Sequence, residues 1–316
     1  MIASLNVFRT FSRACAKVPA AAVALAIFSW PVIAMTGDNG RLCTSSSLLD
    51  ELDRQDRFKL ERMLKNASEI ANSAAVLWKV ESAGKTPSYL FGTVHVVDES
   101  IAALRPAVLD AISKSHIVAL ETAEISRAAM RYAMAQVGPL MVTTDRPLLK
   151  FLGEDEMTAV ERVLFKAGYP KEMALGFRPW VVTLFLNDSD CQKSKHDGGL
   201  KSLDLLVSDE AKARDLKIIG LESMIEQYET MASVSDEAQA AWLKASIHLH
   251  NRVDDMAFTM AELYRFRRLG ILFNLTRELA PEAGLDDATL GALNRDLVLS
   301  RNERMALRSA PLIEQG

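Results

Sequence analysis

The sequence predicts an α/β fold with a central mixed, largely parallel sheet flanked by helices and carrying a mostly helical insertion. Three short apolar runs, SYLFGTVH, IVALE and KIIGLE, each end in a polar residue suited to a ligand site. The segment from Tyr89 to Glu121 reads as strand, loop, helix and strand, which is the size of a parallel βαβ unit. Helical spacing dominates the stretches between and after these runs.

The individual elements follow from periodicity and from turn residues. Apolar residues three and four positions apart predict helices, and the two short apolar runs around Gly84 predict a hairpin. Phe177–Leu186 is apolar almost throughout and fits either a helix or a strand. The expected strands are Ala75–Val80, Ser88–Phe91, Ile117–Leu120 and Lys217–Leu221, and the expected helices are Ser45–Asn72, Ile101–Lys114, most of Ile125–Lys166, Ser202–Ala213, Asp236–Arg268 and Leu290–Ile313.

Composition and charge fit one large globular domain. The chain has 316 residues, of which 49% are hydrophobic and 25% are charged, and its formal net charge is −4. Residues 1–34 carry Arg9, Arg13 and Lys17 and no acid, so the rest of the chain is more acidic still. This balance argues against nucleic acid as a partner.

Residues 1–34 have the pattern of a targeting segment, because basic residues precede the apolar stretch Val18–Ala34. We expect a signal peptide that is cleaved near Ala34, followed by one α/β domain over residues 35–316. The alternative is an uncleaved N-terminal anchor, which the long basic region favours. The expected location is periplasmic or secreted, and contact with a membrane is expected only if this segment stays attached.

Three cysteines are present, and one of them, Cys15, lies in the targeting segment. Cys43 and Cys191 remain, and an even pair in an exported protein indicates a disulfide. Such a bridge would close a long loop, which restricts the unfolded chain strongly. The alternative is two unpaired, half-buried thiols.

The strongest candidates for chemistry come directly after the predicted strands. His95 follows Gly92 at the end of one strand, Glu121 closes the next, and Glu222 closes the third. Open α/β sheets bind ligands at the carboxyl ends of their strands, and adjacent strands lie about 4.8 Å apart. We therefore expect these side chains to meet at one edge, where imidazole and carboxylate can bind a divalent ion or transfer protons.

Each candidate has a functional and a structural interpretation. His95 and Glu121 are expected to act as metal ligand or base, with Glu222 as a third metal ligand, because catalytic divalent sites usually have three protein ligands and a water. Arg301 presents a planar fork and is expected to orient a site carboxylate. The structural alternatives are a loop histidine bonded to backbone, glutamates that cap the following helices, and an arginine in a helix-packing ion pair.

Other polar residues are expected to be structural. Asp204 starts a helix and is expected to cap it or to bond to the sheet, and Glu124 suits a first helical turn. Glu226 lies four residues after Glu222 and shares its face if a helix begins there. The motifs HExxH, P-loop, GxSxG and paired CxxC do not occur in the sequence.

Four segments, in this order and spacing, resemble the TraB/GumN family, which includes the Tiki-type metalloproteases. The resemblance implies an α/β fold with a metal-dependent, peptidase-like hydrolytic site that uses Mn²⁺, Co²⁺ or Zn²⁺. Cys43 and Cys191 resemble the cysteine positions of an exported, GumN-like branch. The matching segments are FGTVH with Gly92 and His95, IVALETAE with Glu121, LDLLVSDEAKARDLKIIGLESMIEQ with Asp204, Glu222 and Gln227, and SRNERMA with Arg301 and Asn302.

The sequence also departs from the family pattern, which continues after the Arg-Asn helix with a strand and a second Gly-x-x-His motif. This sequence stops at Gly316 and contains one such motif. We therefore expect a domain that is incomplete at its C-terminal end and has an unpaired sheet edge. Two functions fit: a hydrolase of the cell envelope, active or inactivated by truncation, and a non-catalytic periplasmic binding or scaffolding protein. The expected partners are a peptide or protein substrate and a second copy in a homo-oligomer.

Overall fold

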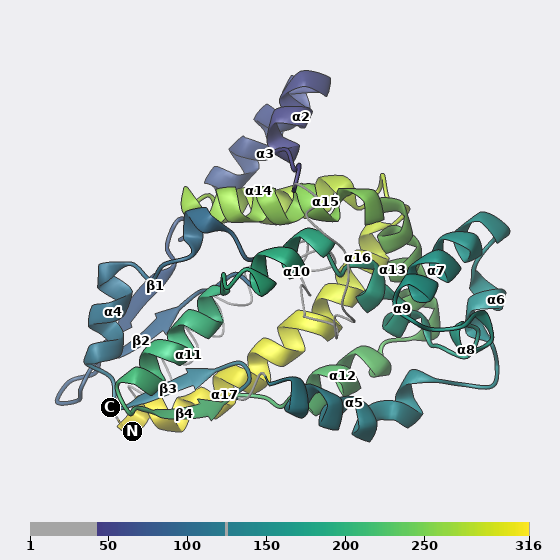
Figure 1. Cartoon of the computed structure of the whole chain (residues 1–316). Coiled ribbons are helices and arrows are strands. Elements are labelled where there is room, and N and C mark those ends of the chain that lie inside the picture. Colours follow the sequence, from purple (N-terminus) through teal and green to yellow (C-terminus); the bar gives the residue numbers. More distant parts are fainter. Residues whose placement is uncertain (1–42, 124–125, 316) are drawn as a thin grey trace.

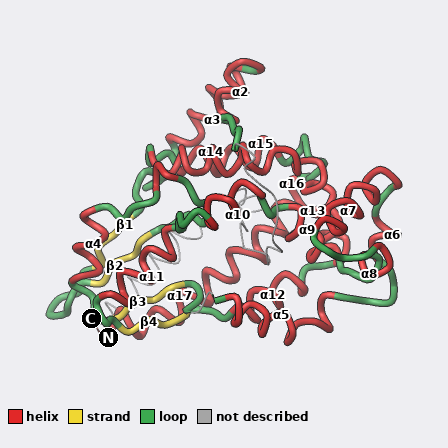
Figure 2. Tube along the Cα trace, viewed as in Figure 1, coloured by secondary structure: helices red, strands yellow, loops and turns green. Residues whose placement is uncertain are grey.

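The computed structural model describes residues 43–123 and 126–315, which form many helices and two small sheets (Figure 1). The strands gather at one end of the molecule, and helices make up the rest (Figure 2). The chain is therefore a mixed α/β protein in which helix dominates. The expectations for residues 1–34 and for Glu124 lie outside the described residues.

The four strands form two pairs. β1 (Leu77–Val80) and β2 (Ser88–Phe91) make the predicted antiparallel hairpin, and β3 (Ile117–Leu120) pairs in parallel with β4 (Lys217–Gly220). Among the described residues β2 and β3 are not paired, so the single central sheet expected from the sequence is not formed there. Periodicity identifies strands but not their neighbours, and β3 pairs with the strand that follows the helical insertion.

Side-chain packing, instead of backbone hydrogen bonds, joins the two sheets. α4 (Pro106–Ser113) and α11 (Leu203–Ala213) pack against the parallel pair and enclose Val118 and Leu120. Phe91, the last residue of β2, packs against the same cluster. The carboxyl ends of β2 and β3 therefore lie close together although the strands do not pair.

Helices form both the insertion between β3 and β4 and the chain after β4. The insertion contains α5 (Arg127–Met141), α6 (Pro147–Phe151), α7 (Glu154–Lys166), α8 (Lys171–Ala174), α9 (Pro179–Leu186) and α10 (Asp190–Asp197), followed by α11. After β4 come α12 (Met224–Ser233), α13 (Asp236–Leu249), the 3₁₀ turn η2 (His250–Arg252), α14 (Val253–Arg265), α15 (Leu269–Leu279), α16 (Asp287–Asn294), the π-helical turn η3 (Arg295–Leu299) and α17 (Ser300–Gln315). Before β1 lie α2 (Leu48–Gln55) and α3 (Arg57–Ser68), and the 3₁₀ turn η1 (Glu99–Ile101) precedes α4.

The largest hydrophobic core lies within this helical part, where α9 packs along α13. Trp180 from α9 and Trp242 from α13 are fully buried there. The ambiguous stretch Phe177–Leu186 is thus a helix, and it is apolar on all sides because neighbouring helices surround it. α17 runs from this part of the molecule to the sheets (Figure 1).

Several predicted helices are interrupted; Asp236–Arg268, for example, divides into α13 and α14 at the 3₁₀ turn η2. Ser45–Asn72 divides at Asp56, whose backbone is not helical and whose side chain caps α3. Ile101–Lys114 gives way to a 3₁₀ turn and then to α4, which begins at Pro106, a residue favoured in the first helical turn. Leu290–Ile313 contains the π-helical turn between α16 and α17.

A disulfide joins Cys43 to Cys191, whose Cα atoms lie 5.5 Å apart. The predicted pairing of these two cysteines is therefore confirmed. The bond connects the start of the described chain to α10, across a sequence separation of 148 residues.

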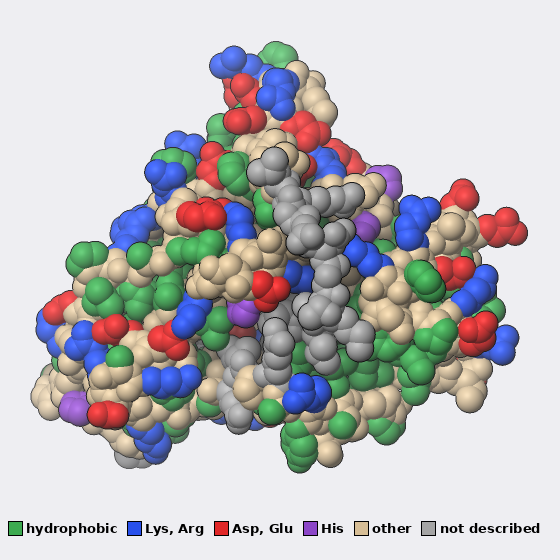
Figure 3. Space-filling model, viewed as in Figure 1, with side chains coloured by type: hydrophobic (Ala, Val, Ile, Leu, Met, Phe, Trp, Pro, Cys, Tyr) green, Lys and Arg blue, Asp and Glu red, His purple; other side chains and the backbone are tan. Residues whose placement is uncertain are grey.

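Charged side chains of both signs are interspersed over the molecular face in Figure 3. Across the parts of the chain that the structure describes, no helix is both long and apolar enough to span a bilayer.

Candidate functional site

Two glutamates lie side by side where the parallel strands end. The β3–β4 ladder continues beyond the strands, because the backbone N–H groups of Leu221 and Glu222 donate to the carbonyl oxygens of Leu120 and Glu121, both at 2.8 Å. Gly220 permits this approach, since a Cβ atom there would lie 2.9 Å from the backbone nitrogen of Ala123. The sequence GLE thus brings Glu222 beside Glu121.

His95 lies in an extended segment after β2, residues 92–98, which we call the strand-end loop. The loop is fixed at its start, where the Gly92 N–H donates to the Val76 carbonyl oxygen (2.8 Å) and the Tyr264 hydroxyl donates to the Gly92 carbonyl oxygen (2.6 Å). Its residues alternate: Val94 and Val96 are buried in a hydrophobic cluster with α14. Thr93 and His95 face Asp204 of α11 instead.

Asp204, in the first turn of α11, holds this polar side of the loop. Its Oδ1 accepts a hydrogen bond from the Thr93 hydroxyl (2.6 Å), and its Oδ2 lies 2.7 Å from His95 Nδ1. A carboxylate only accepts hydrogen bonds, so the Nδ1 atom carries a proton and the imidazole orientation is fixed. Of the two roles that the sequence indicated for Asp204, the structure shows the bond to the sheet side and not the helix cap. Its partner there is the candidate imidazole.

The other ring nitrogen, His95 Nε2, faces Glu121 with 3.8 Å between it and Oε1. Both side chains are partly exposed, at 38% for His95 and 41% for Glu121. Burial alone lowers the pKa of His95, but the contacts with Asp204 and Glu121 outweigh it and raise the pKa to about 10. Burial likewise opposes ionisation of both carboxyls, yet the neighbouring imidazole holds the pKa of each below its usual value.

Arg301 connects the two glutamates. Its Nε lies 3.1 Å from both carboxylate oxygens of Glu222, its Nη2 also donates to Glu222 Oε1, and the same Nη2 lies 3.3 Å from Glu121 Oε2. The Gln227 amide donates to Glu222 as well, at 2.6 Å. The Glu222 side chain is 1% exposed and that of Arg301 is 11% exposed. Burial lowers the pKa of Arg301, but the two glutamates outweigh it and raise it.

The position of Arg301 depends on how α17 begins. The π-helical turn η3 comes directly before α17, and the Arg301 guanidinium also donates to the carbonyl oxygen of Leu297 within that turn (3.4 Å). π-helical turns shift the following side chains round the helix axis and are frequent at functional sites. Further along the same helix, Arg304 donates to Thr230, and Arg308 binds Glu226 and the end of β4. Three arginines of α17 therefore hold this helix next to the strand ends and α12 through hydrogen bonds and ion pairs.

The side chains at this position fit the expected metal ion only in part. His95 Nε2 and Glu121 Oε1 are suitable ligand atoms, and a histidine whose second nitrogen donates to a carboxylate is typical of metal sites. Glu222 is instead paired with Arg301 and Gln227. No group of three or more His, Cys, Asp or Glu side chains suited to an ion occurs in residues 43–123 and 126–315. Among the described residues, His95 and Glu121 are the two candidate ligands at this position.

The structure sorts the remaining candidates. Glu226 does not share a helix face with Glu222, because α12 begins at Met224, after Glu222. It caps α12 by accepting a hydrogen bond from the Ser223 N–H and also binds Arg308, and these bonds lower its pKa to about 2. The sequence indicated only a structural role for Asp204, whereas it orients the candidate imidazole. Its position in the first turn of α11 was the one local feature that could have indicated this contact.

Comparison with known proteins supports one assignment. The model of the TraB/PrgY/gumN family matches residues 76–316, a range that includes the strand-end loop, both glutamates and Arg301. Searches of curated proteins and of solved structures gave no match. The match covers well over half of the sequence, and the chain therefore belongs to the TraB/PrgY/gumN family.

Proposed function

We propose that this protein is a metal-dependent, peptidase-like hydrolase of the cell envelope. The observation that carries the proposal is the arrangement of His95, held at Nδ1 by Asp204 and facing Glu121 with its Nε2. Imidazole and carboxylate from different parts of the chain converge where open α/β folds bind their ligands. The Cys43–Cys191 disulfide supports an exported location, because disulfides persist in oxidising compartments.

His95 Nε2 and Glu121 would hold the ion, which is expected to be Mn²⁺, Co²⁺ or Zn²⁺. A bound divalent ion supplies Lewis acidity that polarises a carbonyl group. The chain's own residues prepare that position: Asp204 keeps the imidazole in one orientation, and Arg301 holds Oε2 of Glu121 so that Oε1 faces His95. The proton on Nε2 must leave before an ion can bind, so the affinity for the ion rises with pH.

Glu222 has a different part in this proposal. Its pairing with Arg301 fixes the guanidinium that orients Glu121, so Glu222 acts on the site through Arg301. Glu222, predicted from the sequence as a third metal ligand, is therefore not a ligand in this proposal.

One observation favours the second function, a non-catalytic binding or scaffolding protein. His95 and Glu121 would give an ion two protein ligands, whereas catalytic zinc sites usually have three. A protein of this kind would keep His95, Asp204 and Arg301 as a network that stabilises the fold.

Ion binding and peptide cleavage together separate the two functions. Thermal unfolding is followed with each of the three ions, and cleavage of a fluorogenic peptide library is followed with and without EDTA. An ion at a hundred times its dissociation constant stabilises the folded chain by about 2.7 kcal/mol, which raises Tm. His95→Gln is expected to lose this shift and the cleavage, whereas Arg308→Met, on the same face of α17 but outside the ion position, keeps both. Wild-type protein that shows neither a shift nor EDTA-sensitive cleavage would refute the hydrolase.

A further inference from the structure

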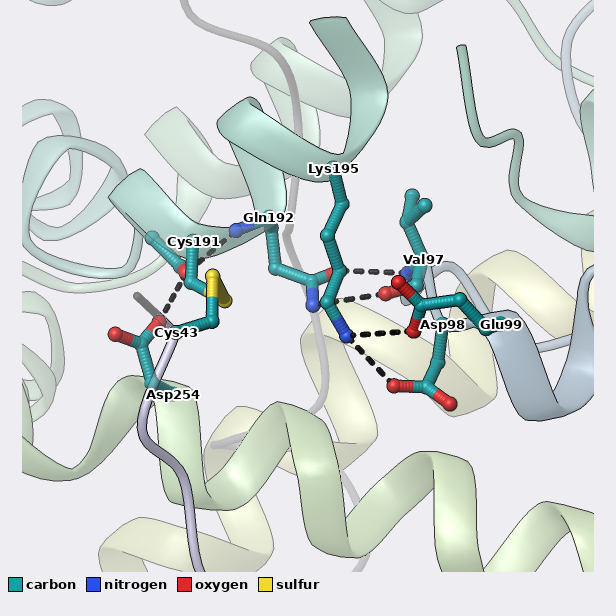
Figure 4. Close-up of a disulfide and its surroundings, with 9 residues drawn as sticks. Cys43, Val97, Asp98, Glu99, Cys191, Gln192, Lys195 and Asp254 are labelled. Carbon is teal, nitrogen blue, oxygen red and sulfur yellow. Dashed lines mark hydrogen bonds and ion pairs between the residues drawn. A yellow bond between two sulfur atoms is a disulfide. The ribbon is translucent and has the colours of Figure 1, made fainter. Parts of the chain in front are cut away.

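One face of α10 binds the C-terminal end of the strand-end loop, at Val97 and Asp98. The side-chain amide of Gln192 bonds to both peptide groups of Val97: its Oε1 accepts from the Val97 N–H (2.6 Å), and its Nε2 donates to the Val97 carbonyl oxygen (3.1 Å). Lys195, one turn further on, binds Asp98 (2.7 Å) and Glu99 (3.4 Å). Figure 4 shows both side chains reaching from the helix to these three residues.

The Gln192 contact needs a primary amide. Gln192 and Val97 are both buried, and the amide supplies one acceptor and one donor to a peptide unit that needs one of each. The pairing copies the bonds that a neighbouring strand would make. Methionine has nearly the same shape but supplies no donor, so Gln192→Met removes the bonds and keeps the volume.

The disulfide attaches this helix to a fixed support. Cys191 precedes Gln192 in α10, and its partner Cys43 begins a segment that is bonded to α14: the Ser46 N–H donates to Asp255 (2.7 Å), and the Leu48 N–H donates to the Thr259 hydroxyl (2.9 Å). A second tie comes from the start of α10, where the Ser189 hydroxyl donates to Asp254 in α14. α14 also supplies Tyr264, which holds the start of the loop.

We infer that α10 is a disulfide-anchored clamp for His95 and that Gln192 is its positioning residue. Val97 lies two positions after His95, so the clamp acts within about 7 Å of the imidazole-bearing backbone. The imidazole must keep a 2.7 Å contact with Asp204, and a shift of about 1 Å would break a hydrogen bond of that length. The inference rests on the proposed function only in so far as a fixed imidazole is needed for ion binding. The contacts that make up the clamp do not depend on that function.

The test uses the full metal-free chain and two measurements. Hydrogen–deuterium exchange reports the opening of residues 92–98, and the ¹H NMR signal of the His95 Nδ1–H reports its bond to Asp204; His95→Gln assigns that signal. Gln192→Met is expected to speed exchange in this segment about tenfold and to remove the Nδ1–H signal through exchange with water. His196→Gln changes a partly exposed residue of the same helix and is expected to leave both measurements at wild-type values.

A Gln192→Met protein that melts earlier but keeps the Nδ1–H signal would overturn the inference, because Gln192 would then serve only stability. If the Gln192→Met protein does not fold, the same two measurements are made on Lys195→Met. Reduction of the folded wild type with dithiothreitol converts the disulfide to two thiols and is expected to produce the same loss; an unchanged signal would overturn the anchoring by the disulfide. Neither measurement requires an ion or a peptide, so both remain decisive if the protein proves not to be a hydrolase.

Discussion

Arg301→Met tests whether α17 holds the site together. The substitution keeps the length of the side chain but removes the charge that faces Glu222, which is 1% exposed, and Glu121. Removing one member of a buried ion pair leaves the other charge desolvated and costs about 3–5 kcal/mol. For a chain of this size we therefore expect Tm to fall by about 10 °C.

Arg308→Met is the matched control. Arg308 lies seven residues further along α17 and also binds a glutamate, Glu226, but these side chains are 44% and 33% exposed. Solvent screens such a pair, so its loss should cost far less stability than the loss of the buried Arg301 pair. The two variants change the same residue type on one helix and differ mainly in burial.

The assay is a double-mutant cycle followed by thermal and urea unfolding. Arg301→Met combined with Glu222→Gln removes both charges, so the double variant should lose less stability than the two single changes added together, with a coupling of about 2–3 kcal/mol. The reasoning is refuted if Arg301→Met is no more costly than Arg308→Met, or if the two changes simply add.

Three further outcomes follow from the contacts described. The pKa of His95 is raised to about 10 in the folded chain, against 6.5 in the unfolded chain, so its stabilising contribution is complete below pH 6.5 and is lost as pH rises to 10. The difference in unfolding free energy between wild type and His95→Gln should therefore shrink between pH 6.5 and pH 10. A constant difference would contradict the pKa shift. Gly220→Ala should cost about 1–3 kcal/mol in urea unfolding because its Cβ meets backbone, whereas Gly291→Ala, in open space within α16, should stabilise by about 0.5–1 kcal/mol; equal effects would refute the packing argument. Cys43→Ser with Cys191→Ser opens a loop of 148 residues, and the chain-entropy model gives a loss of about 5 kcal/mol; a Tm within 2 °C or so of wild type would show that this loop is already restricted.

The strands and the ends that carry chemistry were predictable from local sequence. SYLF and IVAL are short apolar runs bounded by turn or polar residues, and β2 and β3 occupy the predicted ranges. The expectation that His95 and Glu121 approach each other rested on the direction of those strands, and the 3.8 Å separation agrees with it. Their chemical roles remain predictions.

The sequence predicted that Arg301 holds a site carboxylate, and it binds Glu222 and Glu121, but the specific partners were not predictable because they come from distant parts of the chain. Nothing in the spacing indicates that Arg301 binds Glu222, which lies 79 residues away, or that Asp204 reaches His95 across 109 residues. The pairing of strands was missed for the same reason: β3 pairs with β4, from which the whole helical insertion separates it in the sequence. Local patterns specify elements, whereas packing decides which polar groups they bring together.

The alternation along the strand-end loop makes the site sensitive to register. Thr93 and His95 turn towards Asp204, while Val94 and Val96 enter the hydrophobic cluster. Inserting or deleting a single amino acid between Gly92 and the histidine would exchange these two sets, presenting a valine to the carboxylate and pushing the imidazole into an apolar interior. A substitution in this segment changes one side chain, but a change in its length by one residue would alter every side chain that the loop presents to Asp204 and to the hydrophobic cluster.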